Sequence, residues 1–245
     1  MIEFGSKVDP LVNIEDHPVV RGMFGSSKPE VINVKQGNII YERGNDATPL
    51  LVVEGRLARQ TSSPYLDSVL THSLAGPGDV ILEGLTGQAS PVRVFAERDS
   101  SFIPLPPDEM QDLIHQNNEG SRLIVAQLLN RGNQGADLAH MTRFGFRAPF
   151  NKAAYALVTY GPFAKRIQTP EREVWDISSA ATQSELAQAA GMDRHSLNTV
   201  ALKQLQRKRV IERPIINHNT GIRTIRGIQI VDVALLEKFA DPSRT

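Results

Sequence analysis

The sequence predicts an α+β chain with three parts: an N-terminal antiparallel β-roll, a long central helix and a C-terminal winged helix–turn–helix. Short apolar runs alternate with turn residues between positions 31 and 105. A helical pattern extends from about 119 to 143, and two further helices joined at Gly191 precede a hairpin pattern. We place the three parts at residues 1–118, 119–146 and 147–245.

Six apolar runs predict the strands of the roll. They cover residues 31–34, 38–42, 50–59, 68–74, 79–84 and 92–97, and glycine, proline, asparagine and aspartate separate them. Because no helical pattern lies between these short runs, a small antiparallel barrel or roll is expected.

The central helices follow the roll. A helix is expected to open at Pro106 and Pro107, and the long helix after it carries a stripe of small and apolar side chains. Gly132 in this stripe and the nearby Gly135 suggest close approach of a second backbone, although a kink between two shorter helices is an alternative. The stripe consists of Val125, Leu129, Gly132, Ala136 and Ala139.

A hinge is expected at 144–150, followed by a helix at 151–161 and an edge strand at 172–178. The next helix begins with Thr182 and Glu185, which have the spacing of a capping box. Gly191 permits a sharp turn into a second helix near Asp193. A hairpin over 213–227, with its turn at 218–221, and a last helix at 232–240 complete the chain.

The second of these two helices has a polar face suited to DNA. Its apolar residues Leu197, Val200, Ala201 and Leu205 are expected to face inward. Its donors and acceptors, together with two residues of the preceding helix, match base edges and phosphates. The predicted DNA-binding residues are Thr182, Ser184, Arg194, His195, Ser196, Asn198, Thr199 and Lys203.

Charge supports a polyanion-binding part. The formal net charge is zero, but residues 165–226 contain 11 Lys and Arg against 6 Asp and Glu, whereas residues 1–164 contain 14 against 18. A basic C-terminal part fits nucleic-acid binding, and chance scatter of surface charge is the alternative. A helical hairpin alone also occurs in ordinary helical domains. The capping box, the basic run 207–209 and the following hairpin together favour DNA binding.

At this point the sequence resembles the Crp/Fnr family of bacterial transcription regulators. "TQSELAQAAGMDRHSLNTVALKQLQRKRVIE" is similar to the family's DNA-binding segment. "KQGNIIYERGNDATPLLVVEGRLAR" and "LAGPGDVILEGL" are similar to its sensory, cyclic-nucleotide-binding-like roll, and "GIQIVDVALLEKFA" to its C-terminal end. The resemblance implies a homodimer that binds double-stranded DNA at a pseudo-palindromic site and contacts RNA polymerase. A cytoplasmic location is expected because no secretory signal or membrane-length apolar run is seen.

The sequence departs from the family in two places. Cyclic-AMP-binding members carry Gly-Glu and then an Arg-Ser pair that grips the phosphate. Here Glu83 precedes Gly84, Ser90 is followed by proline where that pair would align, and Arg93 is displaced. We therefore expect a degenerate effector pocket that does not bind cyclic AMP, and the effector is unknown.

The second departure lies in the DNA-reading helix. The resemblance keeps Arg194, replaces a Glu by His195 and places Thr199 where many members have another Arg. The spacing from Leu197 to Leu205 is also one residue longer. The family's target DNA sequence therefore cannot be transferred to this chain.

Other functional classes of protein receive less support from the sequence. The chain has no cysteine, which excludes disulfides, a cysteine nucleophile and a cysteine-ligated iron–sulfur cluster. No hydrolase, metalloprotease or nucleotide-binding motif is found, so an enzyme is not expected. No secretory signal or membrane-length apolar run is evident. Four dispersed histidines could ligate haem or metal, but a metal site is not predicted; they are His17, His72, His115 and His140. The alternative function is a haem- or small-molecule-binding sensory module whose winged helix contacts protein.

Overall fold

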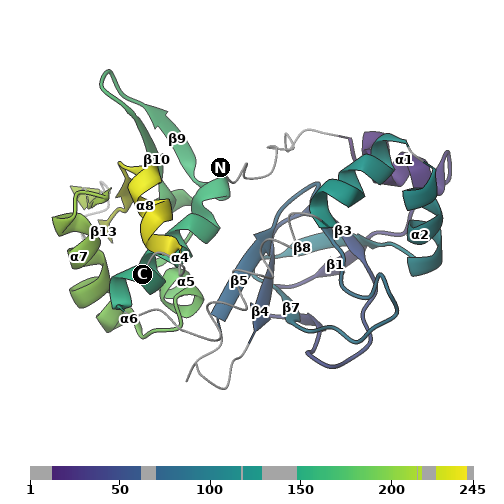
Figure 1. Ribbon diagram of the computed structural model, residues 1–245, viewed down its shortest axis with the longest axis horizontal. Coiled ribbons are helices and arrows are strands. Elements are labelled where there is room, and N and C mark those ends of the chain that lie inside the picture. The colour runs from purple at the N-terminus through teal and green to yellow at the C-terminus, as the bar shows by residue number, and fades with distance from the viewer. Residues whose placement is uncertain are drawn as a thin grey trace. The chain divides into compact units, whose positions relative to one another are not determined.

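The computed structural model describes residues 13–61, 70–116, 118–128, 148–213, 215–216 and 225–241. The chain divides into two compact units. The first comprises Ser6–Thr61 and His72–Ala136, and the second consists chiefly of Asp137–Thr245. They appear in purple to teal and in green to yellow in Figure 1. The predicted boundary at 118 falls just before a helical segment at 119–128, whereas 146 lies outside the described residues. The three-part division therefore stays a prediction.

The N-terminal unit contains two four-stranded sheets, with strand orders β1-β8-β3-β6 and β2-β7-β4-β5. Each of the six predicted regions holds a strand, and the run at 50–59 divides into two strands at Gly55, where φ is 82°. The strand at 100–104 was not predicted. The strands are β1 (Ile32–Val34), β2 (Ile39–Tyr41), β3 (Leu50–Glu54), β4 (Leu57–Thr61), β5 (Leu70–Ala75), β6 (Val80–Ile81), β7 (Arg93–Ala96) and β8 (Ser100–Pro104).

Side-chain alternation along β3 supplies two cores. Leu50 and Val52 belong to a cluster that includes Val94 of the second sheet, so this core lies between the sheets. Leu51 belongs to another cluster, with Ile103 and residues of the helices. One short strand therefore joins the roll to its helical cover.

The helical cover of the N-terminal unit has three parts. Helix α1 (Pro18–Phe24), preceded by the 3-10 turn η1 (Ile14–Asp16), was not predicted from the sequence. Helix α2 (Pro107–His115) begins after Pro106, as expected. The third part is the segment 119–128. Their buried residues join the cluster of Leu51 and are Val19, Val20, Met110, Leu113 and Ile124.

Only the beginning of the predicted central helix is described. Val125 is 42% exposed there, which leaves an apolar side chain on the surface of the single chain. The rest of the predicted stripe, at 129, 132, 136 and 139, lies outside the described residues.

The C-terminal unit combines helices with a small sheet of order β11-β14-β10-β9 and a separate pair, β12-β13. The elements are α4 (Pro149–Tyr160), η2 (Gly161–Phe163), β9 (Lys165–Gln168), β10 (Glu173–Asp176), η3 (Ile177–Ser179), α5 (Gln183–Ala189), α6 (Arg194–Ser196), η4 (Leu197–Ala201), α7 (Leu202–Arg207), β11 (Ile211–Glu212), β12 (Ile215–Ile216), β13 (Ile225–Arg226), β14 (Gln229–Ile230) and α8 (Val233–Ala240). The predicted helices and the predicted hairpin at 213–227 are thus present, while the turn at 218–221 lies outside the described residues.

Two local predictions were wrong. The strand at 172–178 is not an edge strand, because β10 pairs with β9 on one side and β14 on the other. Strand β9, which was not predicted, pairs with β10 to form a hairpin that projects from the helices (Figure 1). Within this hairpin the Arg166 guanidinium carbon lies 3.1 Å from the centre of the Trp175 ring. The predicted hinge at 144–150 was also wrong at its end, because Pro149 and Phe150 belong to α4, and Pro149 is suited to the first position of a helix. Residues 144–147 of the predicted hinge lie outside the described residues.

Among the described helices, none combines the length and the apolar character needed to cross a membrane.

Candidate nucleic-acid interface

The first helix of the interface, α5, begins with the predicted capping box. The hydroxyl of Thr182 accepts a hydrogen bond from the Glu185 backbone, and the Glu185 carboxylate accepts one from the Thr182 N–H. Leu186 and Ala187 are buried, as their spacing predicted. Gly191 adopts a φ of 57° directly after the helix, so the turn uses the left-handed conformation that glycine permits.

The second helix, here called the reading helix, comprises α6, η4 and α7 and extends from Arg194 to Arg207. Asp193 caps it by accepting a hydrogen bond from the Ser196 backbone at 2.8 Å. The Ser196 hydroxyl also donates to this carboxylate, and these bonds hold the pKa of Asp193 below its usual value. The middle segment η4 is a π-helical turn rather than an α-helical one.

Three predicted DNA-binding side chains are exposed donors on the reading helix. Arg194, His195 and Lys203 all lie on its solvent side. Within the part of the chain that the structure describes, their side chains form no hydrogen bond or ion pair. They are therefore available to an external acceptor such as a base edge or a phosphate. Ser184 is likewise exposed on the first turn of α5.

Four other predicted residues are engaged inside the protein. Thr182 and Ser196 take part in the two helix caps described above. The Thr199 hydroxyl donates to the His195 carbonyl oxygen at 2.8 Å, so its one donor is used within the helix and its oxygen remains an acceptor.

Asn198 has the most internal contacts of the predicted set. Its Nδ2 donates to Gln183 Oε1 at 3.0 Å and to the Arg194 carbonyl oxygen at 2.9 Å. Its Oδ1 accepts from Arg213 Nη2 at 2.8 Å. The side chain therefore connects α5, the reading helix and the segment that follows β11. We interpret Asn198 as a positioning residue for the interface rather than a reader of bases.

Sequence reasoning did not identify this network, because Gln183 and Arg213 lie fifteen residues to either side of Asn198. It also misplaced Val200, which was expected to face inward but is 41% exposed. Leu202, with no exposed area, occupies the inward position instead.

The basic run at the end of the reading helix has a partly structural role. The ammonium group of Lys208 lies 5.0 Å from the centre of the Phe150 ring and 5.1 Å from that of Phe239. These two rings, from α4 and α8, meet edge to face. The run therefore helps to attach the reading helix to the rest of the unit.

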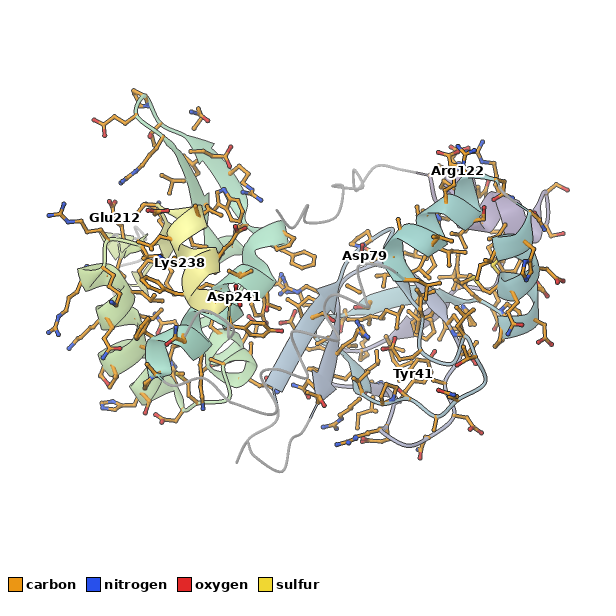
Figure 2. The ribbon with its side chains drawn as sticks, in the orientation of Figure 1. Tyr41, Asp79, Arg122, Glu212, Lys238 and Asp241 are labelled. Carbon is orange, nitrogen blue, oxygen red and sulfur yellow. The ribbon has the colours of Figure 1, made fainter. Side chains whose placement is uncertain are left out.

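The residues of the predicted effector pocket all lie in the described part of the N-terminal unit. The Glu83 carboxylate is buried and accepts hydrogen bonds from the Arg59 guanidinium at 2.5 and 2.9 Å. Arg59 also donates to the Ser73 hydroxyl at 3.2 Å. Tyr41, labelled in Figure 2, donates to the Thr48 carbonyl oxygen. Burial, assisted by the charge of Glu83, raises the pKa of Tyr41 to about 12, so the phenol is protonated at neutral pH.

The other residues of the predicted pocket do not join this cluster. The Ser90 hydroxyl donates to the Val92 carbonyl oxygen at 2.6 Å, and Arg93 pairs at 3.5 Å with Glu42 on the surface. Gly84 has a φ of 83°, and a Cβ atom there would lie 1.9 Å from the Ala47 carbonyl oxygen. Glu83 and Arg93 therefore have different partners, and the arrangement does not form an Arg-Ser clamp.

The histidines do not assemble a metal centre in the described residues. No group of three or more His, Asp or Glu side chains is placed to hold a metal ion there. His17 is buried with Nδ1 accepting from the Val19 N–H and Nε2 at 3.2 Å from the Gly78 carbonyl oxygen. Burial lowers its pKa, so the neutral ring is favoured.

Comparison with solved structures identifies the fold as that of CRP/FNR-family transcriptional regulators. A CRP/FNR-family transcriptional regulator from Thermus thermophilus matches with 24% identity and a TM-score of 0.53, covering 86% of this chain and 98% of its own. A CooA mutant from Carboxydothermus hydrogenoformans matches with 14% identity and a TM-score of 0.62, covering 92% and 96%. FixK2 from Bradyrhizobium japonicum matches with 16% identity and a TM-score of 0.58, covering 86% and 97%.

Sequence comparison alone adds no relative: no protein-family model matches the chain, and no curated protein matches it.

Proposed function

We propose that this chain is a sequence-specific DNA-binding transcription regulator of the Crp/Fnr type, and not an enzyme. The observation that carries the proposal is the reading helix, which presents Arg194, His195 and Lys203 to solvent without partners among the described residues. The fold shared with regulators across most of the chain supports it. Cytoplasmic location and contact with RNA polymerase follow as parts of the same proposal.

Salt dependence of duplex binding is the first test. Phosphate contacts release counterions, so the logarithm of the binding constant should fall linearly with the logarithm of salt concentration. Gel shifts of the full chain on a random duplex and on a selected sequence, each at several salt concentrations, measure this slope. The alternative, a winged helix that contacts protein, predicts no duplex binding at any salt concentration.

Arg194 is assigned to guanine. Its planar guanidinium matches the O6 and N7 acceptors of that base, and its side chain extends from the first turn of the reading helix. Arg194→Ala should cost about 1–3 kcal/mol and relax the preference at one position per half-site. Lys238, labelled in Figure 2, supplies a matched control because it is an exposed cation on another helix, α8. Lys238→Ala should leave the preferred sequence unchanged, whereas loss of preference in both variants would contradict the assignment.

Thr182, Ser184 and Lys203 are assigned to the phosphate backbone. Contacts of hydroxyl and ammonium groups with phosphate oxygens hold the register of a protein on DNA but carry no base information directly. Alanine variants of Ser184 and Lys203 should weaken all sequences equally. Thr182→Ala also removes a helix cap, so its binding should be compared with its unfolding free energy.

The functional form is proposed to be a homodimer on a pseudo-palindromic site. Each chain supplies one reading helix, and the exposed Val125 on the segment 119–128 offers an apolar contact for a second copy. A two-fold dimer places two reading helices about 34 Å apart, one turn of DNA. Analytical ultracentrifugation at micromolar concentration, with and without DNA, tests this, and a monomer in both cases would refute it.

The effector is proposed not to be cyclic AMP. A buried cyclic phosphate requires a cation and several N–H donors. Arg59 is paired with Glu83, Arg93 with Glu42, and Pro91 supplies no N–H. Losing a partly buried arginine contact costs about 2–5 kcal/mol, or roughly thirty-fold or more in affinity. Isothermal titration with cyclic AMP and cyclic GMP tests the proposal, and a dissociation constant in the low micromolar range or tighter would refute it.

A further inference from the structure

The reading helix contains one residue more than an α-helix would need. Its central segment η4, Leu197–Ala201, is a π-helical turn in which the Leu202 N–H donates to the Leu197 carbonyl oxygen, five residues back. A π turn accommodates an extra residue without breaking the helix, and such turns are frequent at functional sites.

The buried side of the helix explains why the wide turn is needed. Leu197 and Leu205 are both buried, at 1% and 0% exposure. Eight steps of an ideal α-helix, at about 100° each, would leave them about 80° apart around the axis. The wide turn lets these eight steps cover about the arc of seven, so the two leucines share one face. Ala201 and Leu202 complete the buried side between them.

The same turn directs Val200 to the opposite side. Val200 is 41% exposed, although valine is among the residues most often buried. Thr199 precedes it and Lys203 follows it, and both belong to the predicted DNA-binding set. The wide turn therefore exposes an apolar group on a helix whose charged side chains, between Arg194 and Arg207, are all cationic.

We propose that Val200 is a specificity-determining residue that contacts the 5-methyl group of a thymine in the major groove. This inference rests on the proposed DNA-binding function. The thymine methyl is the apolar group that base edges present in that groove, and contact with small apolar side chains is how proteins read it. Val200 has no donor or acceptor that could read any other feature. The cations Arg194 and Lys203 on the same helix supply the attraction to DNA that brings the valine to the base edge.

The test removes the two contacting groups, singly and together: the 5-methyl group of thymine and the γ-methyl groups of Val200. In vitro selection with the full-length protein first defines the preferred half-site, and each thymine in one half-site is then replaced by deoxyuridine, which lacks the methyl group. At one position this replacement should weaken wild-type binding about five-fold. In Val200→Ala, which should also bind the unmodified site about five-fold more weakly, the same replacement should have no further effect.

Two further variants serve as controls for this test. Val31→Ala removes another exposed valine, in the N-terminal unit and outside every residue assigned to DNA or dimer contacts, and should retain full sensitivity to deoxyuridine. Val200→Ser repeats the test with a second side chain that lacks the γ-methyl groups, in case the alanine variant unfolds. Because Val200 is exposed, the unfolding free energy of both variants should match that of the wild type.

The outcomes separate the inference from the function. If no duplex sequence is selected and binding does not depend on salt, the proposed function itself fails. If a sequence is selected but every deoxyuridine replacement weakens wild type and Val200→Ala equally, DNA binding stands and the role of Val200 is refuted.

Discussion

Replacing Asn198 by alanine distinguishes a residue that positions the interface from one that reads DNA. The change removes three hydrogen bonds, to Gln183, the Arg194 carbonyl oxygen and Arg213. A net hydrogen bond contributes about 0.5–1.5 kcal/mol, and one to a charged group about 1.5–3. Because the side chain is only partly buried, we take the lower end of each range. The expected loss is about 2.5 kcal/mol in the free energy of unfolding: about 0.5 for each of the two neutral bonds and about 1.5 for the bond from Arg213.

The single tryptophan of the chain provides the assay. Trp175 lies on β10, in the same unit as Asn198, so its fluorescence during guanidinium unfolding reports the relevant part of the molecule. Asn198→Asp keeps an oxygen acceptor for Arg213 but loses both donated bonds, and should cost less than the alanine variant. His195→Ala serves as the control, because its exposed side chain should affect DNA preference and leave stability unchanged.

The coupling between Asn198 and Gln183 sharpens the test. In a double-mutant cycle of the two alanine variants, their hydrogen bond should give an interaction energy of about 0.5–1 kcal/mol. The reasoning is refuted if Asn198→Ala unfolds within about 0.5 kcal/mol of wild type and alters the preferred base at one position of the half-site. Asn198 would then read a base, as the sequence alone suggested.

Three further predictions concern stability. Arg209 follows the reading helix with a φ of 60°, a conformation that costs non-glycine residues about 1 kcal/mol, so Arg209→Gly should raise the unfolding free energy by about that amount in chemical denaturation. Glu83→Gln should leave the largely buried charge of Arg59 without its ion pair and cost about 3–5 kcal/mol, whereas Lys35→Gln, at an exposed pair, should give no measurable change in thermal melting. Burial raises the pKa of Asp79 to about 6 from 3.8, so the folded state binds the proton more tightly than the unfolded state. The free energy of unfolding should therefore fall as pH rises from about 4 to 6. Urea unfolding at several pH values should show this slope in the wild type and not in Asp79→Asn.

Local features of the C-terminal unit were readable from the sequence because neighbouring residues create them. The capping box needs only Thr182 and Glu185 at a spacing of three, and the turn at Gly191 needs a residue that tolerates a positive φ. The strands of the roll follow from apolar runs between turn residues, and all six predicted regions contain one. Even the extra residue between Leu197 and Leu205 was visible as a spacing.

How the molecule accommodates that extra residue was decided by tertiary packing. Leu197 and Leu205 must both be buried, and this requirement selects a wide turn that directs Val200 to solvent and Leu202 inward. The position of β10 inside its sheet likewise depends on β14, more than fifty residues later in the chain. The pairing of Glu83 with Arg59 and the contacts of Asn198 join residues from different elements. Periodicity and local spacing carry no information about such partners, because they are brought together only when the elements pack.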